Sequence, residues 1–222
     1  MRSFCGMPDV TTYLAFVGAV LAYQLSGVGP DMMLVISRGV GQGWRHALAT
    51  AAGCVSAGVV QIPLLAMGLA SLITSSPSLY SFLQIVGAIY LIAIGIKFLL
   101  ARRPGKGGGA STFAETSSIP AAFRQGMICN LTNPTTLAFM LAVLPQFVHP
   151  WIGSPALQFI ILGTTMKMMG LVVLSAVALT SGAVGGWLAR RSTFLVWQER
   201  LAGALMVAIG VRLLFAAVTG RR

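Results

Sequence analysis

Charged residues are scarce in this chain: only 9% of its 222 residues carry a charge, and 56% are hydrophobic. A soluble domain carries about 25% charged residues. With a mean hydropathy of +0.85, the chain lacks the polar side chains needed to cover a water-exposed surface. The composition therefore predicts an all-α integral membrane protein whose solvent is lipid.

Acidic residues are rarer still, since 4 Asp and Glu stand against 15 Lys and Arg, for a formal net charge of +11. A basic excess can indicate nucleic-acid binding, but here the basic residues form short clusters between apolar runs. Such clusters are typical of loops at an anionic membrane face. We therefore expect membrane lipid as a partner and no nucleic acid.

Cysteine and histidine are too few and too scattered for metal or redox chemistry. Cys5, Cys54 and Cys129 include no CxxC pair, and His46 and His149 are isolated. The sequence predicts no disulfide framework, no metal site and no cofactor. Two alternatives to transport stay open: a membrane thiol–disulfide electron carrier, which needs a cysteine pair that can meet, and an intramembrane enzyme, which needs a buried catalytic cluster.

Six apolar runs reach the length of about 20 residues that a membrane-spanning helix requires. A Gly- and Ser/Thr-rich segment at 102–120 has the composition of a flexible linker. It separates two sets of three spans, at 1–101 and 121–222. The six predicted spans cover residues 12–37, 47–74, 79–101, 122–148, 155–188 and 196–218.

The distribution of basic residues predicts the orientation. The loops after the first, third and fifth spans hold most of them: Arg38, Arg45, Arg102, Arg103, Lys106, Arg124, Arg190, Arg191 and Arg200. The opposite side has Arg2, Arg221 and Arg222. Because basic loops stay in the cytoplasm, we expect both termini to face outward.

The two halves carry a weak internal repeat. Stretches 93–100 and 208–215 share the order small, apolar, Gly, apolar, basic, apolar, with Lys97 and Arg212 at the basic position. Three spans per half force opposite topologies, so the halves are predicted to be inverted repeats. Chance similarity between apolar stretches is the alternative. Lys97 and Arg212 lie close to span ends, where snorkelling toward water is expected.

Helix breakers interrupt the first span in the middle of its apolar run. Gly27, Gly29 and Pro30 precede Asp31. A helix break inside a membrane is stable only where its unpaired backbone groups face protein or a water-filled cavity. A carboxylate inside a span costs about 2.5–3.5 kcal/mol on insertion scales. We expect Asp31 to bind a substrate ammonium group or to carry a coupling proton. A helix N-cap or a structural ion pair is the alternative.

A second break lies in the fourth span, around Asn130, Asn133 and Pro134, and Thr135 follows it. The first span of each half is therefore predicted to be a broken helix. The free amides of the half-helix after Pro134 are suited to a substrate carboxylate. The alternative is a proline kink whose backbone groups are satisfied by Asn and Thr side chains.

Lys167 lies near the middle of the fifth span, too far from either end to snorkel easily. It is expected either to meet a substrate carboxylate or to pair with Asp31. A purely structural ion pair remains an equal alternative.

At these residues the chain resembles the LysE/RhtB family of amino-acid exporters. The segment GPDMMLVISR at 29–38 is similar to the family's first-span signature, and the break NLTNP at 130–134 is similar to its fourth span. Further similar segments occur in chain order at 41–45, 52–53, 87–91, 95–97, 123–126 and 144–147. The resemblance thus covers nearly the whole chain.

The resemblance implies a six-span exporter of amino acids or close derivatives in a bacterial inner membrane, working as a proton antiporter. Its partners would be a small-molecule substrate and protons, with a homo-oligomer as one option. In the expected cycle a cytoplasmic zwitterion enters between the halves. Its ammonium meets Asp31, and its carboxylate meets the break at Asn133 and Pro134 or meets Lys167. Proton entry then drives release outward.

Two positions depart from the family pattern. Val28 stands where the family usually has proline, and Thr135 stands where it usually has lysine. The missing lysine removes a positive charge from the second break. Lys167 is the residue expected to supply that charge instead.

Overall fold

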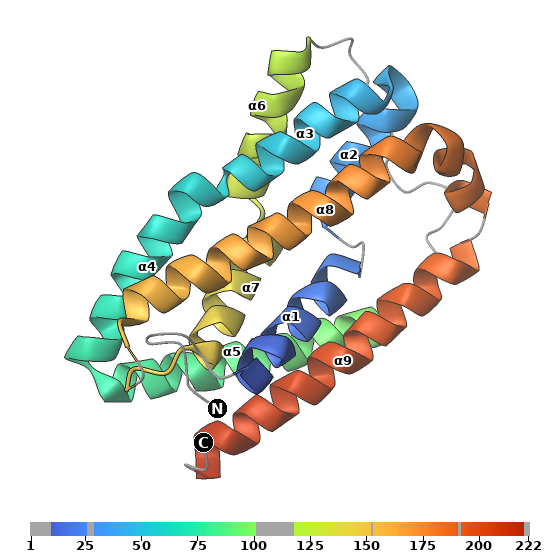
Figure 1. Cartoon of the computed structure of the whole chain (residues 1–222). Helices are drawn as coiled ribbons and strands as arrows, with labels where there is room; N and C mark the ends of the chain where they lie inside the picture. Colours follow the sequence, from blue (N-terminus) through green and yellow to red (C-terminus); the bar gives the residue numbers. More distant parts are fainter. Residues whose placement is uncertain (1–9, 26–28, 101–117, 152, 191, 220–222) are drawn as a thin grey trace.

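The structure is a computed structural model that describes residues 10–25, 29–100, 118–151, 153–190 and 192–219, and these ranges contain helices and no strands (Figure 1). Most of the predicted linker at 102–120 lies outside them. The helices are α1 (Val10–Leu25), α2 (Pro30–Gln42), α3 (Trp44–Ser56), α4 (Gly58–Ser75), α5 (Pro77–Leu99), α6 (Ile119–Leu131), α7 (Pro134–Val143), the 3₁₀-helix η1 (Leu144–Phe147), α8 (Pro155–Arg190) and α9 (Ser192–Thr219).

Two helix pairs are bent at the positions of the predicted breaks. Helices α1 and α2 meet at 51°, and so do α6 and α7. Pro30 and Pro134 are the first residues of α2 and α7. A proline is tolerated there because the first N–H groups of a helix have no intrahelical acceptor. Each proline thus starts a new helix with a new direction.

Long apolar helices support insertion into a membrane. Among the described residues, the segments Trp44–Leu72 and Pro155–Ser181 are each long and apolar enough to cross a membrane. The number rises to four if each bent pair forms one span, and the segment Gln84–Leu99 of α5 is a shorter apolar stretch. The predicted arrangement of six spans stays a prediction.

Helix α8 lies along α3 and α4, and α5 lies along α9 (Figure 1). The most extensive contacts join α5 to α9, followed by α3 to α6. Both pairs cross at glycines. A Cβ placed on Gly126 would lie 2.2 Å from the Thr50 carbonyl oxygen, and one on Gly203 would lie 2.6 Å from that of Gly95. Small residues at helix crossings are the usual way for helices to approach closely in lipid.

Arg38 was predicted to lie in a cytoplasmic loop, but the structure places it in a helix. It lies inside α2 and is only 2% exposed. Its guanidinium donates hydrogen bonds to the side-chain oxygens of Gln42, at 2.8 Å, and Gln125. Because Gln125 belongs to α6, Arg38 joins the two bent pairs on the side of the breaks where α2 ends and α6 begins.

Candidate functional site

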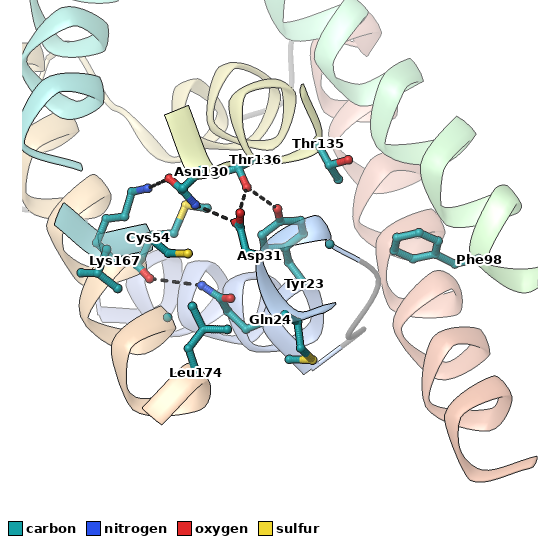
Figure 2. A pocket seen from close by; sticks show the side chains of 15 residues that line it. Tyr23, Gln24, Asp31, Cys54, Phe98, Asn130, Thr135, Thr136, Lys167 and Leu174 are labelled. Atoms are coloured by element: carbon teal, nitrogen blue, oxygen red, sulfur yellow. Dashed lines mark hydrogen bonds between the residues drawn. The ribbon is translucent and has the colours of Figure 1, made fainter. Parts of the chain in front are cut away.

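The carboxylate of Asp31 lies where the two bent helix pairs meet (Figure 2). Its Oδ2 atom accepts hydrogen bonds from Asn130 Nδ2 at 2.7 Å, Asn133 Nδ2 at 3.0 Å and Thr136 Oγ1 at 3.4 Å. These partners follow Asp31 by 99 to 105 residues in the chain. The helix N-cap of α2 is Gly29 rather than Asp31. Asp31 therefore connects the first break to the second.

The other oxygen of Asp31 has unused hydrogen-bonding capacity. Asp31 is 9% exposed, and its Oδ1 atom is buried with no hydrogen-bond partner among the described residues. A buried acceptor without a partner costs about 1–3 kcal/mol, and more when it is charged. A proton or a ligand cation would remove this cost. Asp31 is thus chemically suited to bind either one.

Lys167 is joined to Asp31 through an asparagine. Its Nζ atom donates to Asn130 Oδ1 at 2.7 Å, while the Nδ2 atom of the same amide donates to Asp31. Lys167 is 6% exposed. Its aliphatic stem packs closely on Gly58 of α4, where an added Cβ would lie 2.9 Å from Lys167 Cγ. The amide of Asn130 therefore fixes the positions of both charged groups.

The backbone amides at the start of α7 already have acceptors. Asn133 is the N-cap of this helix, and its Oδ1 accepts from the backbone N–H of Thr135 at 3.0 Å and of Thr136 at 3.4 Å. This is the usual way in which an N-cap satisfies the first amides of a helix. A carboxylate would have to displace Asn133 to reach them.

A small cavity of about 50 Å³ lies beside Asp31. This volume is well below the about 300–1,000 Å³ of usual ligand pockets. Its wall combines polar side chains with apolar ones. The apolar lining includes Met32, Val55, Phe98 and Leu174.

The structure brings together most of the residues that the sequence suggests for a site. Asp31, Asn130, Asn133 and Lys167 form one hydrogen-bonded group. Gly29 and Thr135 line the same cavity as Asp31, Asn130 and Lys167. Pro30 and Pro134 are exposed and act on the site only by starting α2 and α7.

Tyr23 is the lining residue that the sequence reading missed. Its hydroxyl is 3.1 Å from Thr136 Oγ1, and its ring is stacked on Phe139 with centroids 4.0 Å apart. Neighbouring Gln24 donates to the carbonyl oxygen of Met166 at 3.4 Å. A tyrosine at the end of an apolar helix resembles any interfacial aromatic residue in sequence, so only the bend after α1 reveals its role.

The fold and this site define a class: a helical membrane protein in which two interrupted helices meet beside a buried carboxylate and a buried lysine, as in membrane transport proteins. Comparison with known proteins gives the family. The chain belongs to the LysE type translocator family, whose model matches residues 22–217.

Curated relatives match over nearly their full lengths. An uncharacterised membrane protein of Pseudomonas aeruginosa is 29% identical over 218 residues, which cover 96% of this chain and 98% of the relative. A leucine efflux protein of Salmonella typhimurium is 28% identical over 210 residues, covering 94% of this chain and 95% of the relative. No solved structure gives a significant match.

Proposed function

We propose that this protein is a secondary transporter that exports an amino acid or a close derivative from the cytoplasm by proton antiport. Membership of a translocator family favours transport over a thiol–disulfide electron carrier or an intramembrane enzyme. The observation that carries the proposal is the buried Oδ1 atom of Asp31, which has no hydrogen-bond partner in the described part of the chain and lies at the meeting point of two bent helix pairs.

The proposed architecture has six spans in two inverted repeats, at 1–101 and 121–222, joined by the linker at 102–120. Each bent pair would be one broken span, so α1–α2 would correspond to α6–α7, α3–α4 to α8, and α5 to α9. The helix contacts support this exchange. Taken as whole bent pairs, α5 packs on α6–α7 as α9 packs on α1–α2, and α3 packs on α6–α7 as α8 packs on α1–α2, although the half-helices in contact differ.

The basic loops support an orientation in the bacterial inner membrane with both termini outside. In this orientation α1 begins and α9 ends at the outer face, while the end of α2 and the start of α6 point toward the cytoplasm. Substrate would then arrive at Asp31 from the side of Arg38 and leave along α1.

The substrate's two charged groups would bind at opposite ends of the Asn130 amide. The ammonium would bind Asp31 Oδ1, and the carboxylate would bind Lys167 Nζ. Lys167 is favoured over the start of α7 because Asn133 already accepts from those amides. The apolar wall formed by Met32, Phe98 and Leu174 suits an apolar side chain, which agrees with relatives named leucine efflux proteins.

A cycle of alternating access follows from the size of the cavity. At about 50 Å³ the cavity beside Asp31 is smaller than the about 300–1,000 Å³ of usual ligand pockets, so the bent pairs would move to admit an amino acid. Asp31 cannot hold a proton and an ammonium ion at the same oxygen. Protonation from outside would therefore release the substrate, and loss of that proton to the cytoplasm would reset the site.

Export from proteoliposomes tests this function. Vesicles that contain the purified protein are loaded with a panel of labelled amino acids, and efflux is measured with and without an acidic exterior. We expect apolar aliphatic amino acids to leave against their gradient only when the pH gradient is imposed. Efflux at the same rate with and without the pH gradient would contradict proton antiport. If none of the amino acids leaves the vesicles, the proposed substrate class is wrong.

Replacing Lys167 by methionine is expected to raise the half-saturating concentration for leucine export about 10- to 100-fold, since a hydrogen bond to a charged group contributes about 1.5–3 kcal/mol. Methionine keeps most of the stem that packs on Gly58. L-leucinamide, which has no carboxylate, should be exported equally by both proteins. Lys97→Met makes the same change at an exposed lysine of α5 and should have no effect. Unchanged leucine export by Lys167→Met would refute carboxylate binding there.

A further inference from the structure

A second and larger cavity lies at the end of the molecule where α1 begins. It has a volume of about 470 Å³ and shares no lining residue with the cavity beside Asp31. Ligand pockets in proteins usually measure about 300–1,000 Å³, so this cavity is large enough for an amino acid. Its polar and charged lining residues are Thr11, Thr12, Gln84, Gln146, His149 and Arg212.

The lining of this outer cavity is suited to an anion. Arg212 lines it from α9, and none of the described residues that form the wall is acidic. A guanidinium can hold a carboxylate with two parallel hydrogen bonds. The amide and hydroxyl groups around it can donate further hydrogen bonds to the same oxygens.

The wall opposite α9 is fixed by hydrogen bonds rather than by packing alone. Gln146 Nε2 donates to the carbonyl oxygen of Gln84 at 2.8 Å and so ties η1 to α5. Gln158, which is fully buried, accepts from the backbone N–H of His149 at 2.9 Å and donates to its carbonyl oxygen at 3.0 Å. The Nδ1 atom of His149 is buried with no hydrogen-bond partner among the described residues. This wall is therefore rigid and has hydrogen-bonding capacity left.

The two cavities are separated by an aromatic contact. Ala15 lines the outer cavity and Tyr23 lines the inner one, so the two cavities are separated along α1 by about 12 Å of helix. In this interval Phe16 is 0% exposed, and its ring meets that of Phe147 edge to face, with centroids 5.3 Å apart. Phe147 itself lines the outer cavity. A path between the cavities along α1 would pass this pair.

We propose that the outer cavity is a second substrate site, in which Arg212 binds the carboxylate of the exported amino acid after it has passed Phe16 and Phe147. This inference rests on the proposed export function. The proposal also gives Arg212 a role that Lys97, at the matching position of the predicted repeat, does not have, because Lys97 lines neither cavity. The two basic residues at matching positions thus have different roles.

External inhibitors of efflux test the second site. Vesicles that export labelled L-leucine are exposed on the outside to one of three probes: L-leucine, 4-methylpentanoate, which lacks the ammonium, or L-leucinamide, which lacks the carboxylate. We expect the two carboxylates to slow efflux and leucinamide to have no effect. Arg212→Gln should raise their half-inhibitory concentrations about tenfold or more, as expected for a lost hydrogen bond to a charged group. Arg200→Gln removes an exposed arginine elsewhere on α9 and should leave inhibition unchanged.

Direct binding separates a failure of this site from a failure of the export function. Labelled 4-methylpentanoate is bound to the purified protein and to its variants in detergent. Binding that is lost in Arg212→Gln but kept in Lys167→Met supports the outer site, even if no vesicle exports leucine. Binding that is lost in Lys167→Met but kept in Arg212→Gln overturns it. Arg212→Lys, which keeps the charge, should bind with intermediate strength and shows that the loss does not come from unfolding.

Discussion

Replacing Asp31 by asparagine is expected to abolish uphill export while leaving the fold intact. Asparagine has nearly the same shape, and its oxygen can still accept hydrogen bonds from the Asn130 and Asn133 amides, which hold the two breaks together. What disappears is the negative charge. Removing one partner of a buried ion pair costs about 3–5 kcal/mol, which corresponds to a factor of 100 or more in affinity for an ammonium group. Proton-driven efflux from loaded vesicles measures this loss.

Counterflow distinguishes the two roles that Asp31 can have. In this assay labelled and unlabelled amino acid exchange across the vesicle membrane without any pH gradient. If Asp31 binds the ammonium, Asp31→Asn loses counterflow together with uphill export. If Asp31 only carries the proton, counterflow survives and uphill export is lost. Intact uphill export would reject both roles.

A threonine at the second break provides the matched control for Asp31→Asn. The Thr132 hydroxyl hydrogen-bonds to the carbonyl oxygens of Ile128 and Cys129 in its own helix and lies on an exposed position. Thr132→Val therefore changes a polar group at the break without touching the Asp31 network. It should export at the native rate. An equal loss in Thr132→Val and Asp31→Asn would mean that the break tolerates no change and that the charge has no special role.

In the proposed antiport a single carboxylate would be sufficient for coupling, and the described residues that line the site include no second carboxylic acid. Oδ2 of Asp31 is used in holding α6 and α7, and Oδ1 would be left for an exchangeable cation. A proton and an ammonium ion would compete for that atom, so binding of one would favour release of the other. The three donors on Oδ2 keep the carboxylate in place during this exchange. Coupling would therefore depend on a fixed carboxylate and on bent helices that move around it.

The sequence predicted the positions of the breaks because their causes are local. Pro30 and Pro134 lack an N–H group and are therefore favoured at the first position of a helix. The start of α8 at Pro155 agrees with the predicted fifth span for the same reason. The contact between Asp31 and Asn130 is not local, since 99 residues separate them. The predicted repeat made their meeting a reasonable hypothesis, but no spacing rule gives the hydrogen bonds.

Other features depended on tertiary contacts that the sequence does not encode in any short pattern. Arg38 was counted as a loop residue because it follows an apolar run, yet it is buried against Gln125 of α6. Removing it from the charge count leaves the basic bias on the same side. Tyr23 was missed because its partners, Thr136 and Phe139, follow the second break. Both errors have one physical cause: a polar side chain in a membrane helix is placed by the helix that packs against it.

Adding one methyl group at Gly126 is expected to destabilise the protein strongly. Alanine has a higher helix propensity than glycine by about 1 kcal/mol, so propensity alone predicts stabilisation. Packing predicts the opposite, because the new Cβ would lie 2.2 Å from the Thr50 carbonyl oxygen of α3, and a backbone atom cannot rotate away. Helices α3 and α6 would have to separate, and overpacking of this kind costs about 1–3 kcal/mol or more.

Gly68→Ala provides a control of opposite sign. A Cβ on Gly68 meets no atom within 4 Å, and this residue is exposed within α4. Thermal unfolding in detergent should therefore show a higher melting temperature for Gly68→Ala and a lower one for Gly126→Ala. Asn130 lies four residues after Gly126 and so on the same face of α6. A displaced α6 should thus also weaken export, even in the fraction of Gly126→Ala that folds. A melting temperature at or above the native value in Gly126→Ala would show that the close crossing of α3 and α6 does not support the site.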